Sequence, residues 1–316
     1  MNWTEHYQSH RMTAEEAVRL IQSGQRVFLT GNCSVPKRLL NALVEYAPTL
    51  RDVEICQALT VAGSEYVAPE MEGHLRVNTL FISSNVRKAV WEGRADFTPV
   101  LLSELPLLFK NGILPLDVAL VHISPPDRNG FCTLGIESGL TKAAAEAAHV
   151  IIAQGNPNMP RMLGDTLIHV NQLDAIVEVD EPLSELAMTE EGDLSIVCEI
   201  ARHIAERIPD GATMQLGIGA IPNAVLTFLF EKKDLGVHSE LFSDSVIELF
   251  EAGVLTGARK TLHPGKIVAG FIIGTRRLYQ WVHDNPIVEL YRTEYVNNPF
   301  TRSEEHTSEL QSRQVI

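Results

Sequence analysis

The sequence predicts an α/β fold of two similar open α/β domains, each built on a largely parallel sheet. Three observations support this prediction. Short apolar runs alternate with helical patterns, two distant segments repeat one strand–glycine turn–helix pattern, and 316 residues are enough for about two domains. Strands separated by helical crossovers pair in parallel, with helices on both faces of the sheet.

The elements can be placed in order along the chain. A first helix is expected from Thr13 to Ile21, because Thr13 and Glu16 form a capping box. The expected elements that follow are strand Val27–Leu29, helix Pro36–Tyr46, strands Val53–Thr60, Val77–Ile82 and Val118–Ile123, helix Ser138–Ala148 and strand Val150–Ala153.

The repeated pattern joins the two halves of the chain. The segment from Gly24 to Gly31, followed by Pro36, resembles the segment from Gly211 to Gly219, followed by Pro222. In both, a helix ends at glycine, and a strand, a glycine turn and a proline-led helix follow. Chance similarity is an open alternative, because all βα units follow the same order of strand, turn and helix. As a true repeat, the pattern predicts domains over 1–185 and 194–300, joined through the acidic segment 180–193.

The second copy of the pattern also suggests a site. A strand over Ala212–Leu216 is expected to break at Gly217 and Gly219, where missing Cβ atoms let a ligand approach the backbone. A helix expected from about Pro222 would present its N-terminus, a natural seat for an anion. Downstream, the run from His238 to Asp244 supplies the Glu240 carboxylate, which can act as a covalent nucleophile. Taken alone, the turn also fits a plain connection and Glu240 a solvated charge.

Composition excludes several classes of protein. The formal net charge of −14 and the pI of about 5.2 argue against nucleic acid as a partner. The four cysteines form no metal-ligand pair, so we expect no metal site and buried free thiols. The polar segment 1–11 is no secretory signal, and no apolar stretch is long enough to cross a membrane, which predicts a cytoplasmic protein.

Several motifs, in this order along the chain, resemble one family. The motifs are Asn85–Pro99, Ser103–Pro106, Ile123–Gly135, Asn156–Arg161, Gly164–Asp165, Gln215–Pro222 and His238–Asp244. Together they resemble the acetyl-CoA hydrolase/transferase group of class I CoA-transferases, and within it the 4-hydroxybutyrate and acetate (butyrate) CoA-transferases. The resemblance covers residues from about 10 to 300, and the family's pair of similar open α/β domains agrees with the repeat.

The resemblance implies a function. Glu240 aligns with the glutamate that carries the acyl group and then CoA, and Gln215, Leu216, Gly217, Ile218 and Gly219 resemble the CoA-binding turn. The substrates would be an acyl-CoA and a short-chain carboxylate of the acetate, butyrate or 4-hydroxybutyrate type, with no tightly bound cofactor, because the thioester energy is conserved. A homo-oligomer is expected for the full-length protein. An acyl-CoA hydrolase of the same fold and a non-catalytic phospho-ligand-binding α/β protein are the alternatives.

Other residues are weaker candidates. Arg87, Arg94 and Arg161 could hold a carboxylate or phosphate, but structural ion pairs or solvated side chains are favoured for each. The segment 156–160 could line an acyl pocket or form a rigid turn. For His238, a loop position with a backbone hydrogen bond is favoured over a general base.

The end of the chain departs from the α/β pattern. Residues 302–312 read as the translation of a common sequencing-library adapter, so we expect 302–316 to be foreign to the fold. Because the family continues past the segment that resembles 297–300, the second domain is expected to be truncated and the activity of this chain to be poor.

Overall fold

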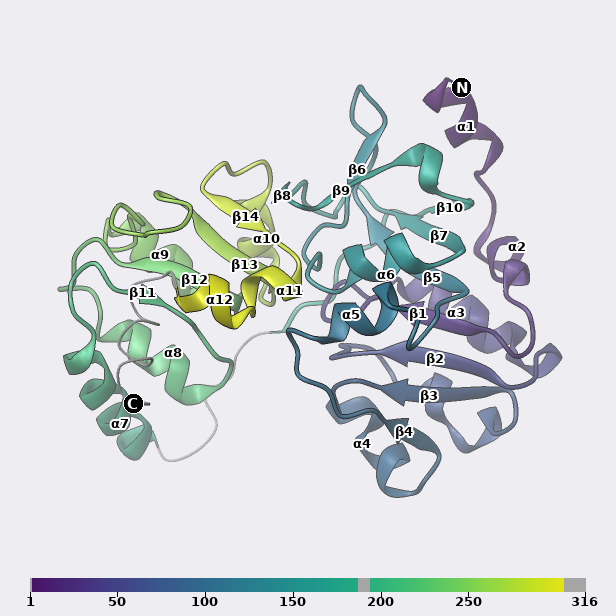
Figure 1. Cartoon of the computed structure of the whole chain (residues 1–316), viewed down its shortest axis with the longest axis horizontal. Coiled ribbons are helices and arrows are strands. Elements are labelled where there is room, and N and C mark those ends of the chain that lie inside the picture. Colours follow the sequence, from purple (N-terminus) through teal and green to yellow (C-terminus); the bar gives the residue numbers. More distant parts are fainter. Residues whose placement is uncertain (1, 187–193, 304–316) are drawn as a thin grey trace. The chain divides into compact units, whose positions relative to one another are not determined.

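The computed structural model describes residues 2–186 and 194–303, in two compact units (Figure 1). The first comprises Met1–Arg161 and Thr166–Ser184, and the second Met162–Asp165 and the residues from Glu185 onward. No helix within the described residues combines the length and apolar content needed to cross a membrane.

The first unit is built on a seven-stranded sheet in the order β10-β7-β5-β1-β2-β3-β4, in which all neighbours are parallel. Its strands are β1 (Arg26–Leu29), β2 (Val53–Gln57), β3 (Leu75–Thr79), β4 (Ala95–Phe97), β5 (Val118–Ile123), β7 (Val150–Gly155) and β10 (Ala175–Glu178), and the antiparallel pair β6 (Phe131–Thr133) and β9 (Leu167–His169) lies outside this sheet. The α-helices are α1 (Trp3–Ser9), α2 (Ala14–Ala17), α3 (Lys37–Tyr46), α4 (Ser84–Trp91), α5 (Leu105–Lys110) and α6 (Thr141–Ala147). Short 3₁₀ turns are η1 (Val18–Leu20), η2 (Ala47–Thr49), η3 (Glu65–Val67), η4 (Pro69–Met71) and η5 (Val170–Gln172).

Helices cover both faces of this sheet because successive strand side chains point to opposite sides. In β1, Val27 and Leu29 join a core with helices α2, α3 and α4, whereas Phe28 joins a second core with α5 and α6. The expected capping box is present, since Glu16 N donates to Thr13 Oγ1 and Thr13 N to the Glu16 carboxylate.

The second unit contains a five-stranded parallel sheet in the order β11-β12-β13-β14-β8. Its strands are β11 (Thr213–Met214), β12 (Gly236–Phe242), β13 (Ile267–Ile272), β14 (Val288–Leu290) and β8 (Leu163–Gly164). Its helices are α7 (Leu194–Arg207), α8 (Ala220–Thr227), α9 (Ser245–Glu251), α10 (Arg276–Val282), α11 (Thr293–Val296) and α12 (Pro299–Ser303).

The predicted fold class is confirmed, and the two sheets share a topology. Strands β1 to β4 lie side by side in chain order, as do β11 to β14, and a helix follows the first strand of each series. The sheets differ beyond this series, because β1 also pairs with β5 whereas β11 ends its sheet among the described residues. Strand β8, which falls within the range expected for the first domain, pairs with β14 in the second unit.

Some local expectations were wrong. Strand β11 covers only Thr213–Met214 of the expected 212–216, whereas α8 begins at Ala220, close to the start expected near Pro222. Of the four cysteines, Cys198 is exposed rather than buried. The segment expected to be foreign begins within α12, which ends at Ser303, and residues 304–316 lie outside the described residues.

Candidate active site

The candidate nucleophile, Glu240, lies near the carboxyl end of β12. Of the seven residues in this strand, Glu240 alone is partly exposed, and the other six are buried. A carboxylate costs much free energy to bury, so one inside an otherwise buried parallel strand is held there by specific partners or by function.

One described partner of Glu240 is the side chain of Asn297, which follows α11. Asn297 Nδ2 donates to Glu240 Oε2 at 3.1 Å. Burial raises the pKa of Glu240, and the Asn297 hydrogen bond, together with the charge of Arg302, opposes that rise. The site therefore holds a carboxylate that is partly stripped of water and oriented by an amide.

The residue before Glu240 connects it to the glycine turn. Leu216 N donates to Ser239 Oγ at 2.9 Å, and Ser239 Oγ donates to Leu216 O at 3.1 Å. Ser239 is buried, so these two hydrogen bonds are shielded from water. The turn is thereby bound to the strand that carries Glu240.

The glycine turn itself, residues 215–219, presents its backbone. Gln215, Gly217 and Ile218 are exposed, and Gly219 is the N-cap of α8 with φ at 126°. A Cβ at Gly219 would meet no atom within 4 Å, so the space above it is open. The turn thus combines accessible amides with a helix N-terminus, a combination that suits an anionic or oxyanionic group.

A cavity of about 400 Å³ adjoins this turn within the second unit. Its wall includes Gln215, Leu216, Gly217, Ile221, Pro222 and Val225. Arg207 and Arg302 also line it. A mostly apolar cavity with a few convergent polar groups is a typical small-molecule site.

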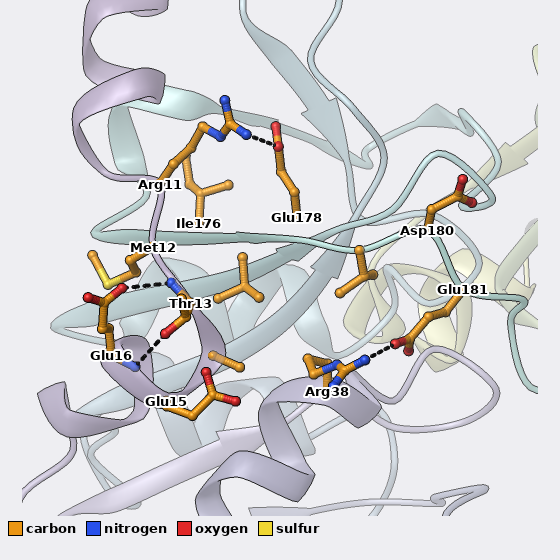
Figure 2. A pocket seen from close by; sticks show the side chains of 13 residues that line it. Arg11, Met12, Thr13, Glu15, Glu16, Arg38, Ile176, Glu178, Asp180 and Glu181 are labelled. Carbon is orange, nitrogen blue, oxygen red and sulfur yellow. Dashed lines mark hydrogen bonds and ion pairs between the residues drawn. The ribbon is translucent and has the colours of Figure 1, made fainter.

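A groove of about 700 Å³ in the first unit is less suitable for an anionic ligand. Figure 2 shows its two guanidinium groups, Arg11 and Arg38, already paired with Glu178 and Glu181. Three more carboxylates, Glu15, Glu16 and Asp180, also line it, so acidic groups outnumber basic ones. This excess would repel phosphate or carboxylate.

Comparison with known proteins identifies the same family as the sequence motifs. Residues 1–186 match the acetyl-CoA hydrolase/transferase N-terminal domain. The chain is 48% identical over 299 residues to the 4-hydroxybutyrate coenzyme A transferase of Clostridium kluyveri, covering 95% of this chain and 69% of that protein. It is 40% identical over 288 residues to the succinyl-CoA:acetate/propanoyl-CoA:succinate CoA transferase of Fasciola hepatica, covering 90% of this chain and 59% of that one.

The chain belongs to the acetyl-CoA hydrolase/transferase family. Among solved structures, the 4-hydroxybutyrate CoA-transferase of Porphyromonas gingivalis superposes with a TM-score of 0.86 at 36% identity, covering 96% of this chain and 73% of that one. The similar proteins are CoA-transferases, which confirms the transferase interpretation over the alternatives.

Two of the three weaker arginine candidates form ion pairs within the first unit. Arg94 donates to Val67 O and pairs with Glu92, and Arg161 pairs with Asp127 at 3.3 Å. Arg87 is exposed on α4. These contacts match the favoured structural interpretation of Arg94 and Arg161.

Two predictions around the motifs are corrected or refined. His238 was expected in a loop, but it is a buried residue of β12, because the strand extends from Gly236 to Phe242 and so includes the first five residues of the motif. Asn156 forms a rigid turn, with its Oδ1 accepting from Asn158 N at 3.0 Å and its Nδ2 donating to Glu181 O at 2.8 Å. Asp244 anchors the start of α10 by accepting from Thr275 N and Oγ1.

Sequence reasoning missed a cluster of buried polar side chains in the first unit. The strand order reverses between β1 and β5, the position at which open α/β sheets bind ligands beyond the carboxyl ends of their strands. Past these strands lie Asn32 and Ser34, whose buried side-chain oxygens have no hydrogen-bond partner among the described residues. His122 is buried beside them, which lowers its pKa to about 4. The only signal in the sequence was a run of small and polar residues after a strand.

Proposed function

We propose that Glu240 is the covalent nucleophile of a CoA transfer between an acyl-CoA and a short-chain carboxylic acid of the acetate, butyrate or 4-hydroxybutyrate type. Residues 215–219 would bind CoA. The observation that carries the proposal is the position of Glu240 in β12, with Asn297 on its carboxylate and Ser239 binding its strand to the glycine turn. The names of the similar CoA-transferases support the substrate class.

The chemistry needs one carboxylate and no net redox change. The Glu240 carboxylate attacks the thioester carbonyl, the C–S bond breaks, and a mixed anhydride and the CoA thiolate form. The thiolate then attacks the glutamyl carbonyl, which releases the first acid as a carboxylate and leaves a glutamyl-CoA thioester. An acceptor carboxylate repeats the two steps in reverse, leaves as its CoA ester and restores Glu240.

The surrounding residues match these steps. Each addition develops a negative oxygen, which preorganised donors stabilise in a site with little water. The backbone N–H groups of the exposed residues Gly217 and Ile218 could be such donors, and Asn297 orients the carboxylate before attack. Partial burial of Glu240 removes water molecules that would otherwise hydrogen-bond to its carboxylate and lower its nucleophilicity.

Borohydride trapping tests the proposal directly. The chain is incubated with butyryl-CoA, reduced, digested and analysed by mass spectrometry. We expect reduction of the glutamyl-CoA thioester to an alcohol at Glu240 alone, no such product in Glu240→Gln, and an unchanged product in Glu251→Gln, a substitution of an exposed carboxylate on α9. A reduced residue elsewhere would refute the assignment.

The acceptor is tested in the same preparation. Acetate, butyrate and 4-hydroxybutyrate are each added to the chain that carries the glutamyl-CoA thioester, and formation of the new CoA ester is compared with loss of the thioester to water. Transfer to an acid that exceeds loss to water supports the proposed substrate class. Loss to water at the same rate with every acid would contradict it.

A further inference from the structure

A cluster of aromatic and ionisable side chains lies on the same sheet as Glu240. Tyr295 of α11 is in ring contact with His238 of β12 at a centroid distance of 6.1 Å and with Tyr291 at 5.2 Å. His238 and Glu240 point to the same face of β12, because strand side chains alternate. Helix α11 packs against both β12 and β13.

The tyrosine is held at its far end by His263. The Tyr295 hydroxyl lies 2.7 Å from His263 Nε2, and the two rings meet edge to face. His263 Nδ1 lies 3.4 Å from a Glu289 oxygen. A carboxylate can only accept, so Nδ1 carries the hydrogen and Nε2 accepts the hydroxyl proton of Tyr295. Burial lowers the pKa of His263, which favours this neutral form.

Glu289 is itself fixed. It pairs with Lys266 at 3.0 Å and accepts from the Tyr291 hydroxyl at 2.9 Å. The residues Lys266, Glu289, His263 and Tyr295 therefore form a continuous line of polar contacts that ends on α11. A network of polar contacts of this kind holds each side chain more firmly than an isolated hydrogen bond would.

Helix α11 needs such an anchor. It has four residues, too few for a helix that is stable by itself. Asn297, which holds the Glu240 carboxylate, is its C-cap, and Asn297 N donates to Thr293 O at 2.9 Å. The position of the Asn297 amide therefore depends on where α11 is held.

We propose that Tyr295 and His263 are positioning residues: by clamping α11 they place the Asn297 amide, and through it the Glu240 carboxylate, for attack on the thioester. This inference rests on the proposed role of Glu240. The hydrogen bond to the Glu240 carboxylate comes from Asn297, so we assign the effect of the clamp to that amide.

The test compares Tyr295→Phe with the wild-type chain. This substitution keeps the ring and removes the bond to His263. We expect the rate of Glu240 acylation by butyryl-CoA to fall about tenfold, with less than about a twofold change in the half-saturating butyryl-CoA concentration. The matched control is Tyr7→Phe, which removes a tyrosine hydrogen bond of the same length, to Glu178 in the first unit, and should leave the rate unchanged.

A double-substitution cycle separates positioning from general damage. If Tyr295 acts through Asn297, adding Tyr295→Phe to Asn297→Ala should slow acylation no further than Asn297→Ala alone. Wild-type acylation in Tyr295→Phe, or effects that multiply in the double variant, would overturn the clamp.

Amide hydrogen exchange tests the clamp without any chemistry at Glu240. Peptides covering 291–298 should exchange faster in Tyr295→Phe than in Tyr7→Phe and the wild type. If the wild-type chain forms no adduct at Glu240, the proposed function fails, and exchange alone decides the clamp. Equal exchange in all three proteins overturns it.

Discussion

The Ser239 hydroxyl binds both polar groups of Leu216, accepting from its N–H at 2.9 Å and donating to its carbonyl at 3.1 Å. Leu216 is the second residue of the glycine turn, and Ser239 precedes Glu240 on β12. One side chain thus sets the separation between the proposed CoA-binding turn and the proposed nucleophile. A hydroxyl can do this because it is both donor and acceptor.

Replacing Ser239 with alanine should separate the turn from the strand. Both hydrogen bonds are lost, and the Leu216 N–H and carbonyl lose a buried partner, which costs about 1–3 kcal/mol of unfolding free energy. We expect kcat/KM for butyryl-CoA to fall by about tenfold to a hundredfold, since a small displacement of reacting groups is costly. Thr227→Ala is the control, because among the described residues the Thr227 hydroxyl donates to Ala224 O within its own helix, α8. Equal activity in the two variants would show that the turn is held by other contacts.

The pH dependence of acylation should report Glu240. The carboxylate must be ionised to attack, so activity is lost as pH falls through its pKa. Because burial raises that pKa, the acid limb of kcat/KM should lie above the ordinary value of 4.5. Asn297→Ala removes a hydrogen bond that favours the ionised form, so the limb should move to higher pH still. The trapping rate is the suitable measurement, because it does not involve the acceptor acid. A limb that stays in place or moves down in Asn297→Ala would contradict the assignment.

Sequence reasoning predicted the parts of the site that are local. The glycine turn and Glu240 were chosen because each stands in a short motif that resembles one of the family, and their roles stay predictions. Asn297 could not be recognised in this way, because it lies 57 positions downstream of Glu240. The two side chains meet only once the intervening β13, α10 and β14 have folded. The same holds for the His263–Tyr295 contact. The buried strands β5 and β7 were predicted well because continuous apolar runs mark parallel strands. β8 was missed because two residues carry no periodicity.

The two glycines of the turn should respond differently to alanine. Gly219 has φ at 126°, a conformation that an L side chain rarely adopts, so Gly219→Ala should cost about 1–3 kcal/mol despite the open space around it. A Cβ at Gly217 would lie 3.4 Å from Pro222 Cγ, an ordinary contact, with no positive φ. Gly217→Ala should therefore leave the melting temperature unchanged. Both variants can be followed by thermal unfolding and by butyryl-CoA titration. Equal melting temperatures for the two would contradict the strain assigned to Gly219.

Helix α7 presents an apolar stripe that should limit solubility. Ile196, Ile200 and Ile204 are spaced four residues apart and are 56%, 39% and 41% exposed. Residues at this spacing share one face of a helix, and a continuous exposed apolar face favours association. We expect the double substitution Ile196→Glu and Ile200→Lys to reduce aggregation in light scattering.

The design of this pair keeps the helix stable. The glutamate lies in the first turn, where the helix dipole favours negative charge, and it precedes the lysine by four residues, the favourable order for an ion pair. Acylation of Glu240 should not change. The control Ala201→Glu places a charge at a fully buried position of the same helix and should unfold the second unit. If the Ile196 and Ile200 double variant aggregates as much as the wild type, the stripe is not the surface through which the chain associates.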